Sequence, residues 1–95
     1  MEVITMSGVL QEDSELKVDK KGRNYIRFKV VCHGVDPIGN ERLNTYMCYT
    51  HNTQFLSLKK GDLVFVVGPL TISRYKESIR LEVYAEHINS GVVVK

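Results

Sequence analysis

The sequence predicts a small all-β domain in which five strands close into a barrel, with one short helix between strands three and four. Apolar and polar residues alternate in five segments, which is the period of a strand with one face in a core. Turns rich in glycine and polar residues separate these segments. One segment, residues 50–61, breaks the alternation and carries helix signals. At 95 residues the chain is predicted to be a single domain, residues 1–95.

The first predicted strand runs from Val3 to Leu10. One face carries Ile4, Met6, Gly8 and Leu10, and the other carries Val3, Thr5, Ser7 and Val9. The polar stretch "QEDSELKVDKKGRN" continues from this strand to a tight turn, in which Gly22 can adopt a positive φ.

Strands two and three are predicted at residues 25–32, "YIRFKVVC", and residues 43–50, "LNTYMCYT". Between them, "HGVDPIGNER" is predicted to be a surface loop because it carries two glycines and a proline. The core face of strand two carries Ile26, Phe28, Val30 and Cys32, and its outer face carries Tyr25, Arg27, Lys29 and Val31.

The helix is predicted within residues 50–61, with two to three turns, a polar cap at its start and Gly61 after its end. Strand four follows in "DLVFVVGPLTISRY", where Gly68 permits a bend or bulge. A turn at Lys76 and Glu77 leads into strand five, "SIRLEVYAEHI". Its predicted core residues are Ile79, Leu81, Val83 and Ala85. Three strands, a helix and two strands are in the order of an OB-fold barrel.

The composition is that of a soluble globular protein, with 43% hydrophobic and 25% charged residues. The net charge is only +2, so affinity for a polyanion would depend on where the cations lie. No apolar run is long enough for a membrane span and no secretion signal is present, so we expect a cytoplasmic protein that does not contact a membrane. Cys32 and Cys48 are expected to be reduced, partly buried thiols rather than a disulfide.

Several stretches resemble the bacterial single-stranded DNA-binding protein family. They are "GVLQEDSELK", "YIRFKVV" after a "KKG" turn, "LKKGDLVFVVGPL" and the aromatic of "ISRY", and the resemblance covers Val3 to about Ile88. It implies an OB-fold that binds single-stranded DNA in replication, recombination or repair, as a homodimer or homotetramer. The chain lacks tryptophan and the family's C-terminal acidic tail, so it resembles a tail-less member. Primosomal replication protein N, which has the same fold, is a related possibility.

The resemblance also implies roles for individual residues. Tyr75 falls where the family places an aromatic that stacks on bases, and Tyr46 falls where it has a stacking tryptophan. Arg27 and Lys29 occupy the face of strand two that in the family faces the nucleic acid.

Independently of the resemblance, a protein that holds single strands needs cations for the phosphates and flat aromatic rings for the bases. This sequence interleaves the two kinds of residue in its first and last hairpins. The predicted nucleic-acid-binding residues are Lys21, Arg23, Tyr25, Arg27, Lys29, Tyr46, Arg74, Tyr75 and Lys76. The alternative is that the cations serve solubility and the tyrosines pack across strands. Tyr84 is read as a packing residue, because Glu82 and Glu86 would repel phosphates.

We expect no catalysis, no cofactor, no metal and no small-molecule substrate. The histidines, His33, His51 and His87, are far apart and lack a partner at ligand spacing. No nucleophile elbow, phosphate-binding loop or paired-carboxylate motif is present, and Asp13 and Glu15 are read as loop charges. The alternative function is an OB-fold protein-interaction or assembly module without nucleic-acid binding. For a homo-oligomer, the candidate interface residues are Val3, Thr5 and Val9 on the outer face of strand one, a face that is equally compatible with a monomer.

Overall fold

The computed structural model describes residues 2–35 and 37–90, with the side chain of Tyr75 outside the description. None of the helices in these residues is long and apolar enough to cross a membrane. The described strands and the one short helix, in chain order, are β1 (Val3–Leu10), β2 (Glu15–Val18), β3 (Asn24–Val35), β4 (Glu41–Thr50), the 3₁₀ helix η1 (Thr53–Ser57), β5 (Leu63–Tyr75), β6 (Ser78–Tyr84) and β7 (His87–Ser90).

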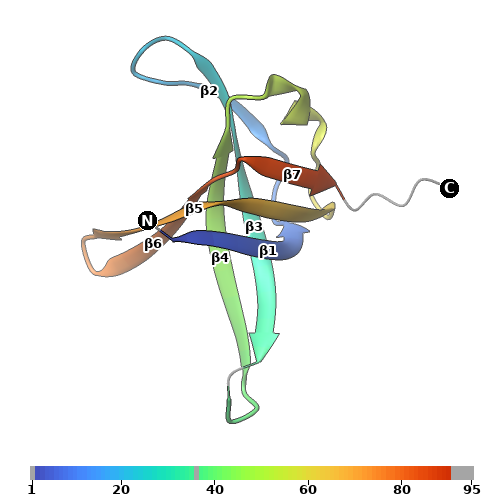
Figure 1. Ribbon diagram of the computed structural model, residues 1–95, viewed down its shortest axis with the longest axis vertical. Helices are drawn as coiled ribbons and strands as arrows, with labels where there is room; N and C mark the ends of the chain where they lie inside the picture. The colour runs from blue at the N-terminus through green and yellow to red at the C-terminus, as the bar shows by residue number, and fades with distance from the viewer. Residues whose placement is uncertain (1, 36, 91–95) are drawn as a thin grey trace, which may run out of the picture.

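Five of these strands close into a barrel. β1 pairs with β3, β3 with β4, β6 with β5, and β5 with β1, all antiparallel, while β4 and β6 are parallel. The two short strands are additions, since within the described residues β2 pairs only with β3 and β7 only with β5. In Figure 1, β3 and β4 run along the long axis and β1, β5 and β7 cross them steeply. The predicted five-stranded OB-fold barrel is confirmed.

The buried core includes seven of the predicted core residues: Met6, Leu10, Ile26, Phe28, Val30, Val83 and Ala85. Its largest fully buried side chains are Phe28, Leu10, Ile26, Val30, Val64, Val66, Val83 and Cys48. One prediction was wrong: Ile79 is 65% exposed. Ile79 lies near the tip of the β5–β6 hairpin, paired with Arg74, where the strands have left the barrel and no core faces them.

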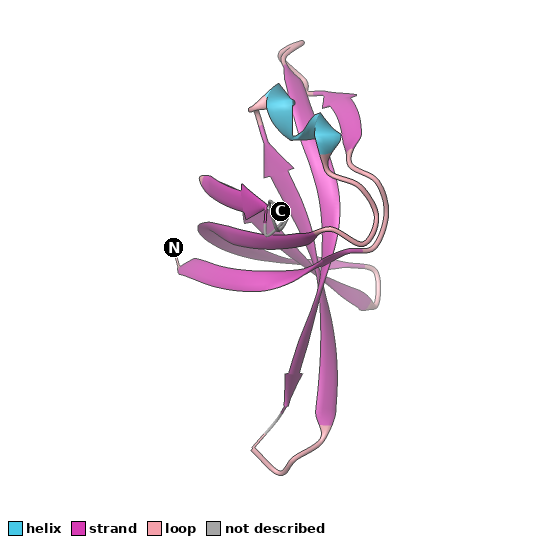
Figure 2. Ribbon diagram, turned by 90° about the vertical axis from the view of Figure 1, so that its right-hand side faces the viewer, coloured by secondary structure: helices cyan, strands magenta, loops and turns pink. Residues whose placement is uncertain are grey.

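The predicted surface loop at residues 33–42 begins and ends in strand. β3 and β4 stay paired as far as Val35 and Glu41, so their hairpin projects from the barrel as a long arm (Figures 1 and 2). Hydrogen bonds between paired backbones extend strands even where no core faces them. The alternation of apolar residues therefore does not predict this part of the hairpin. The stretch predicted as a polar continuation of β1 likewise contains a strand, β2. The tight turn after β2 is confirmed, with φ of 80° at Gly22.

The predicted helix of two to three turns is a 3₁₀ helix of five residues. Asn52 caps its start by accepting a hydrogen bond from the Gln54 backbone at 3.2 Å. At its end, Leu58 is extended and almost fully buried, so the chain turns into the core rather than continuing the helix. The Ser14 hydroxyl lies 3.1, 2.9 and 3.0 Å from the carbonyl oxygens of residues 55, 56 and 58 at the end of this helix.

Gly68 is required by a close approach between strands. A Cβ at this position would overlap the carbonyl oxygen of Tyr84. Beside it, the backbone of Glu86 donates to Val67 at 2.9 Å, and Ala85 donates to Tyr49 at 2.8 Å. The chain can therefore cross from β6 to β7 only where β5 has no side chain.

Candidate nucleic-acid interface

Alternation along β3 directs a row of cations and one aromatic ring away from the core. Because Ile26, Phe28 and Val30 are buried, Arg27 and Lys29 point outward. The register pairs Arg27 with Tyr49 and Lys29 with Met47, and paired residues share a face of the sheet. β6 continues this face, with Glu82 opposite Met47 and Tyr84 opposite Tyr49. We call this surface the β3–β4–β6 face, consisting of Tyr25, Arg27, Lys29, Met47, Tyr49, His51, Arg80, Glu82 and Tyr84.

A groove of about 320 Å³ lies on this face between β3, β4 and the β5–β6 hairpin. Three cations border it: Arg27 and Lys29 from β3, and Arg80 from β6. Met47 and Tyr49 contribute an apolar and an aromatic surface between them. The remaining lining residues are Thr45, Ser78, Ile79 and Leu81. The groove therefore combines positive charge with a ring, as a site for a nucleic-acid strand requires.

Four rings form a continuous row beside the groove. The ring centroids of Tyr25 and Tyr49 are 5.9 Å apart, those of Tyr25 and His51 are 6.2 Å apart, and those of His51 and Tyr84 are 5.8 Å apart. All three pairs are tilted. These distances are typical of packed aromatic pairs, so the rings support one another across β3, β4 and β6.

Hydrogen bonds hold both ends of this row. The Tyr49 hydroxyl donates to Glu82 Oε2 at 2.6 Å, and the Ser73 hydroxyl donates to Glu82 Oε1 at 3.2 Å. Burial first, and then the bond to Glu82, raise the pKa of Tyr49 to about 12. At the other end, His51 Nδ1 lies 2.9 Å from the Tyr84 hydroxyl, and His51 Nε2 lies 3.3 Å from Asp19 Oδ2.

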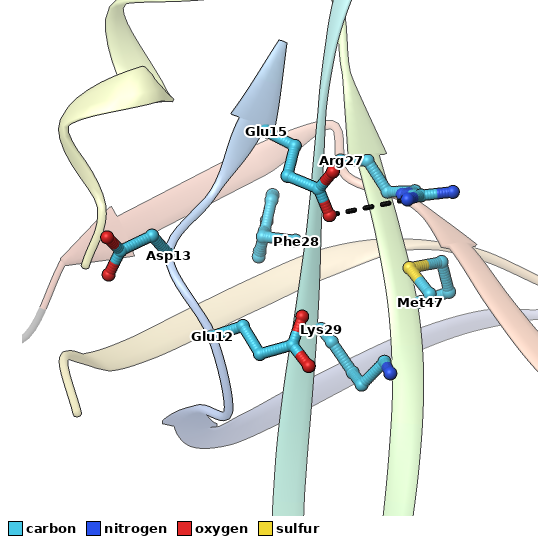
Figure 3. A pocket seen from close by; sticks show the side chains of 7 residues that line it. All are labelled: Glu12, Asp13, Glu15, Arg27, Phe28, Lys29 and Met47. Atoms are coloured by element: carbon cyan, nitrogen blue, oxygen red, sulfur yellow. Dashed lines mark hydrogen bonds and ion pairs between the residues drawn. The ribbon is translucent and has the colours of Figure 1, made fainter. Parts of the chain in front are cut away.

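Carboxylates flank the cations on the side of β2. Glu12, Asp13 and Glu15 line a small pocket of about 50 Å³ with Arg27 and Lys29. Figure 3 shows Glu15 reaching Arg27, whereas Asp13 points away from both cations. The Glu15 Oε1 and Arg27 Nη2 atoms are 3.3 Å apart, and the bond from Arg27 is the main reason that the pKa of Glu15 is lowered. Arg27 is thus shared between the groove and a carboxylate.

The predicted cations of the β2–β3 turn are organised by Asp19. Its Oδ1 accepts hydrogen bonds from the backbone of Lys21 at 2.8 Å and of Arg23 at 2.9 Å, and its Oδ2 accepts one from Arg23 Nε at 3.0 Å. The bond from the Arg23 backbone is the largest of the causes that lower the pKa of Asp19 to about 2. Arg23 is therefore held beside a carboxylate that is charged at neutral pH.

Of the predicted residues, the structure brings Tyr25, Arg27 and Lys29 together on one face. It does not bring Tyr46 there, because Tyr46 pairs with Val30 and packs half-buried against the core. Burial accordingly raises the pKa of Tyr46.

The hairpin-tip residues divide between the two sides of the β5–β6 hairpin. Arg74 pairs with Ile79, on the opposite side from Arg80, and does not line the groove. Lys76 forms the turn with a φ of 56°. The backbone of Tyr75 pairs with that of Ser78, but the prediction that its side chain stacks on bases lies outside the described residues.

Sequence reasoning missed Tyr49, His51 and Arg80 as members of this face. The alternation along the strand could have placed Tyr49 and His51 on the outer face, because they are out of phase with the buried Cys48 and Thr50. Tyr84 packs against the His51 ring while remaining 45% exposed. Both cysteines are free, and burial raises the pKa of the Cys32 thiol.

No family model matches the sequence, and no curated protein matches it. The crystal structure of a small single-stranded DNA-binding protein from Streptomyces coelicolor matches with a TM-score of 0.75 and 17% sequence identity, over 96% of this chain and 93% of that one. The two proteins share one fold.

OB-folds bind oligonucleotides and oligosaccharides on the face of their second and third barrel strands and on the neighbouring loops. In this OB-fold those strands are β3 and β4, and the loops are the β2–β3 turn and the tip of the β5–β6 hairpin. The groove lies at that place. Within residues 2–35 and 37–90, no group of three or more His, Cys, Asp or Glu residues could hold a metal ion.

Proposed function

We propose that this protein binds single-stranded DNA with little sequence preference, without catalysing a reaction. The observation that carries the proposal is the groove on the β3–β4–β6 face, which Arg27, Lys29, Arg80 and Tyr49 line together. Cations along a groove neutralise phosphates, and rings beside them stack on bases. Each stacked base is worth about 1–3 kcal/mol, and stacking tolerates any sequence because every base has a π face.

The charges on the face suggest a path for the strand. The carboxylates of Glu12 and Glu15 lie on the β2 side of Arg27 and Lys29, whereas Arg80 lies on the β6 side. The carboxylates of Glu12 and Glu15 repel phosphates, whereas Arg80 attracts them. We therefore infer that the sugar-phosphate backbone follows the groove along Arg27, Lys29 and Arg80, with bases turned toward Tyr49 and Tyr25.

Two further observations support this function. The Streptomyces coelicolor protein with the same fold is described as a single-stranded DNA-binding protein. The sequence motifs resemble the bacterial family of that activity, and we infer that this chain is a member with a role in DNA replication, recombination or repair in the cytoplasm. Because tyrosine stacks less strongly than tryptophan, we expect weaker binding than in relatives that carry tryptophan.

The direct test is a fluorescence-polarisation titration of a labelled poly-dT strand at low salt, with duplex DNA and RNA as competitors. We expect saturable binding that duplex DNA displaces poorly and that weakens as salt rises. Absence of binding at low salt would refute the proposal.

A second candidate is supported by the outer face of β1 and β5, on the other side of the barrel wall from the core. It carries the exposed apolar residues Val3, Val9, Leu63 and Phe65, and the register places Val9 beside Leu63. No charged residue occupies the outward positions of β1 or those of β5 from Leu63 to Pro69. Contiguous apolar surface of this kind is typical of protein interfaces. We propose that this face joins copies of the chain into a homodimer or homotetramer.

Sedimentation of the protein and of Phe65→Ser separates the two candidates. A variant that becomes monomeric but still binds DNA supports DNA binding as the function, with assembly as an addition. If the protein assembles through this face and does not bind poly-dT at low salt, the function is assembly alone.

A further inference from the structure

Glu82 is an unexpected residue on a surface that would hold phosphates. We propose that Glu82 is a positioning residue, which fixes the ring of Tyr49 as a stacking surface through the hydrogen bond from the Tyr49 hydroxyl. This inference rests on the proposed function and deepens it, because it assigns a role to a residue that the charge pattern alone would count as unfavourable.

The geometry shows that the Glu82 carboxylate is held at both oxygens. Oε2 accepts from the Tyr49 hydroxyl at 2.6 Å, and Oε1 accepts from the Ser73 hydroxyl at 3.2 Å. The bonds come from both neighbouring strands, since Tyr49 is on β4 and Ser73 is on β5. A distance of 2.6 Å is typical of a hydrogen bond from a hydroxyl to an ionised carboxylate, which is among the stronger kinds. The carboxylate is therefore a fixed anchor.

The anchored ring is the one that lines the groove. Tyr49 lies between the cations of β3 and Arg80 of β6, and its centroid is 5.9 Å from that of Tyr25. Burial and Glu82 keep the hydroxyl protonated, with a pKa of about 12, so it remains a donor at neutral pH. A ring already held in its bound orientation loses less freedom when a base stacks on it, and this improves affinity.

Two effects of Glu82 oppose each other. Its charge repels phosphates and weakens binding, whereas its hydrogen bond orients Tyr49 and strengthens binding. Glu82→Gln and Glu82→Ala remove the same charge, but the amide oxygen of glutamine can still accept from the Tyr49 hydroxyl. The difference between these two variants therefore isolates the hydrogen bond.

The experiment measures the affinity of wild type, Glu82→Gln and Glu82→Ala for labelled poly-dT at one salt concentration, after thermal melting has shown that each is folded. We expect Glu82→Gln to bind at least as tightly as wild type, and Glu82→Ala to bind about 3- to 10-fold more weakly than Glu82→Gln. Equal affinity of the two variants would overturn the inference.

As a control, Glu82→Gln and Glu82→Ala are compared again in a protein that also carries Tyr49→Phe. Phenylalanine keeps the ring but has no hydroxyl, so the two Glu82 variants should now bind equally. A difference that persists without the hydroxyl would mean that Glu82 acts through packing, which contradicts the inference. If Glu82→Ala does not fold, Tyr49→Phe alone decides, because wild-type affinity in that variant would show that the hydroxyl anchor does not matter.

These outcomes are distinct from failure of the proposed function. Wild-type protein that does not bind poly-dT at low salt refutes single-stranded DNA binding, and the role of Glu82 with it. Wild-type binding with equal affinity of the two Glu82 variants refutes only the positioning role.

Discussion

Two arginines on opposite sides of one hairpin test whether the groove is the phosphate path. Arg80 borders the groove, whereas Arg74 faces the opposite side of the hairpin from Arg80 and does not line the groove. Arg80→Gln and Arg74→Gln change the net charge equally on the same element. A long-range effect of charge alone would therefore affect binding similarly in both variants.

The expected magnitude follows from the number of cations in the groove. Three cations, Arg27, Lys29 and Arg80, border it. Each phosphate contact to a single strand adds about 0.7 to the slope of log affinity against log salt, so three contacts give a slope of about −2. Between about 50 and about 200 mM salt, the affinity of the wild type should fall about 18-fold. Loss of one contact in Arg80→Gln should reduce the slope to about −1.4 and the fall to about 7-fold.

The assay is polarisation of labelled poly-dT across that range of salt for the wild type and both variants. We expect a lower slope for Arg80→Gln and an unchanged slope for Arg74→Gln. Equal slopes for the two variants, whether both lowered or both unchanged, would refute the reasoning that the groove contains the phosphates.

Three other measurements follow from contacts around the site. Glu15→Gln should tighten binding of poly-dT by a few-fold, because Arg27 is released from its ion pair; unchanged or weaker binding in the same titration would count against that reading. The folded-state pKa of Asp19 is lowered from 3.8 to about 2, so its contribution to stability is present above pH 3.8 and is lost as the pH falls toward 2. Thermal melting should show Asp19→Asn less stable than wild type at neutral pH. The difference in melting temperature should disappear as the pH falls from 3.8 toward 2. Ser14→Ala should destabilise the fold by about 1–3 kcal/mol in denaturant titration, because it removes a buried hydroxyl bonded to the end of η1.

Local patterns predicted the direction of side chains but not how far each strand extends. The alternation placed Phe28 inside and Arg27 outside correctly, because a strand that borders a core has a fixed period of two. The same rule pointed Ile79 inward, yet it is exposed, because the hairpin continues beyond the barrel. The arm of β3 and β4 was missed for a related reason. Backbone pairing there does not depend on an apolar face.

The contents of the interface depend on contacts between residues distant in sequence. Tyr49 and Glu82 meet only because β4 and β6 pair in parallel, and no turn between them fixes that register. A hairpin register can be read from its turn, whereas this one requires the barrel to close. Family resemblance placed Tyr46 at the binding face, but Tyr46 has the same parity as the buried Cys48. Tyr49 has the opposite parity and lines the groove.

The mixture of charges on the interface has a consequence for how tightly it would hold a strand. The net charge of the chain is only +2, so attraction must arise locally from Arg27, Lys29 and Arg80. Two carboxylates lie among these cations, and each bonds a residue of the groove: Glu15 bonds Arg27, and Glu82 bonds Tyr49. Both carboxylates fix the geometry of a group that would contact DNA while lowering the local positive potential. On the proposed function, this arrangement favours binding that is oriented but moderate in strength, and therefore readily reversed by salt or by a competing protein.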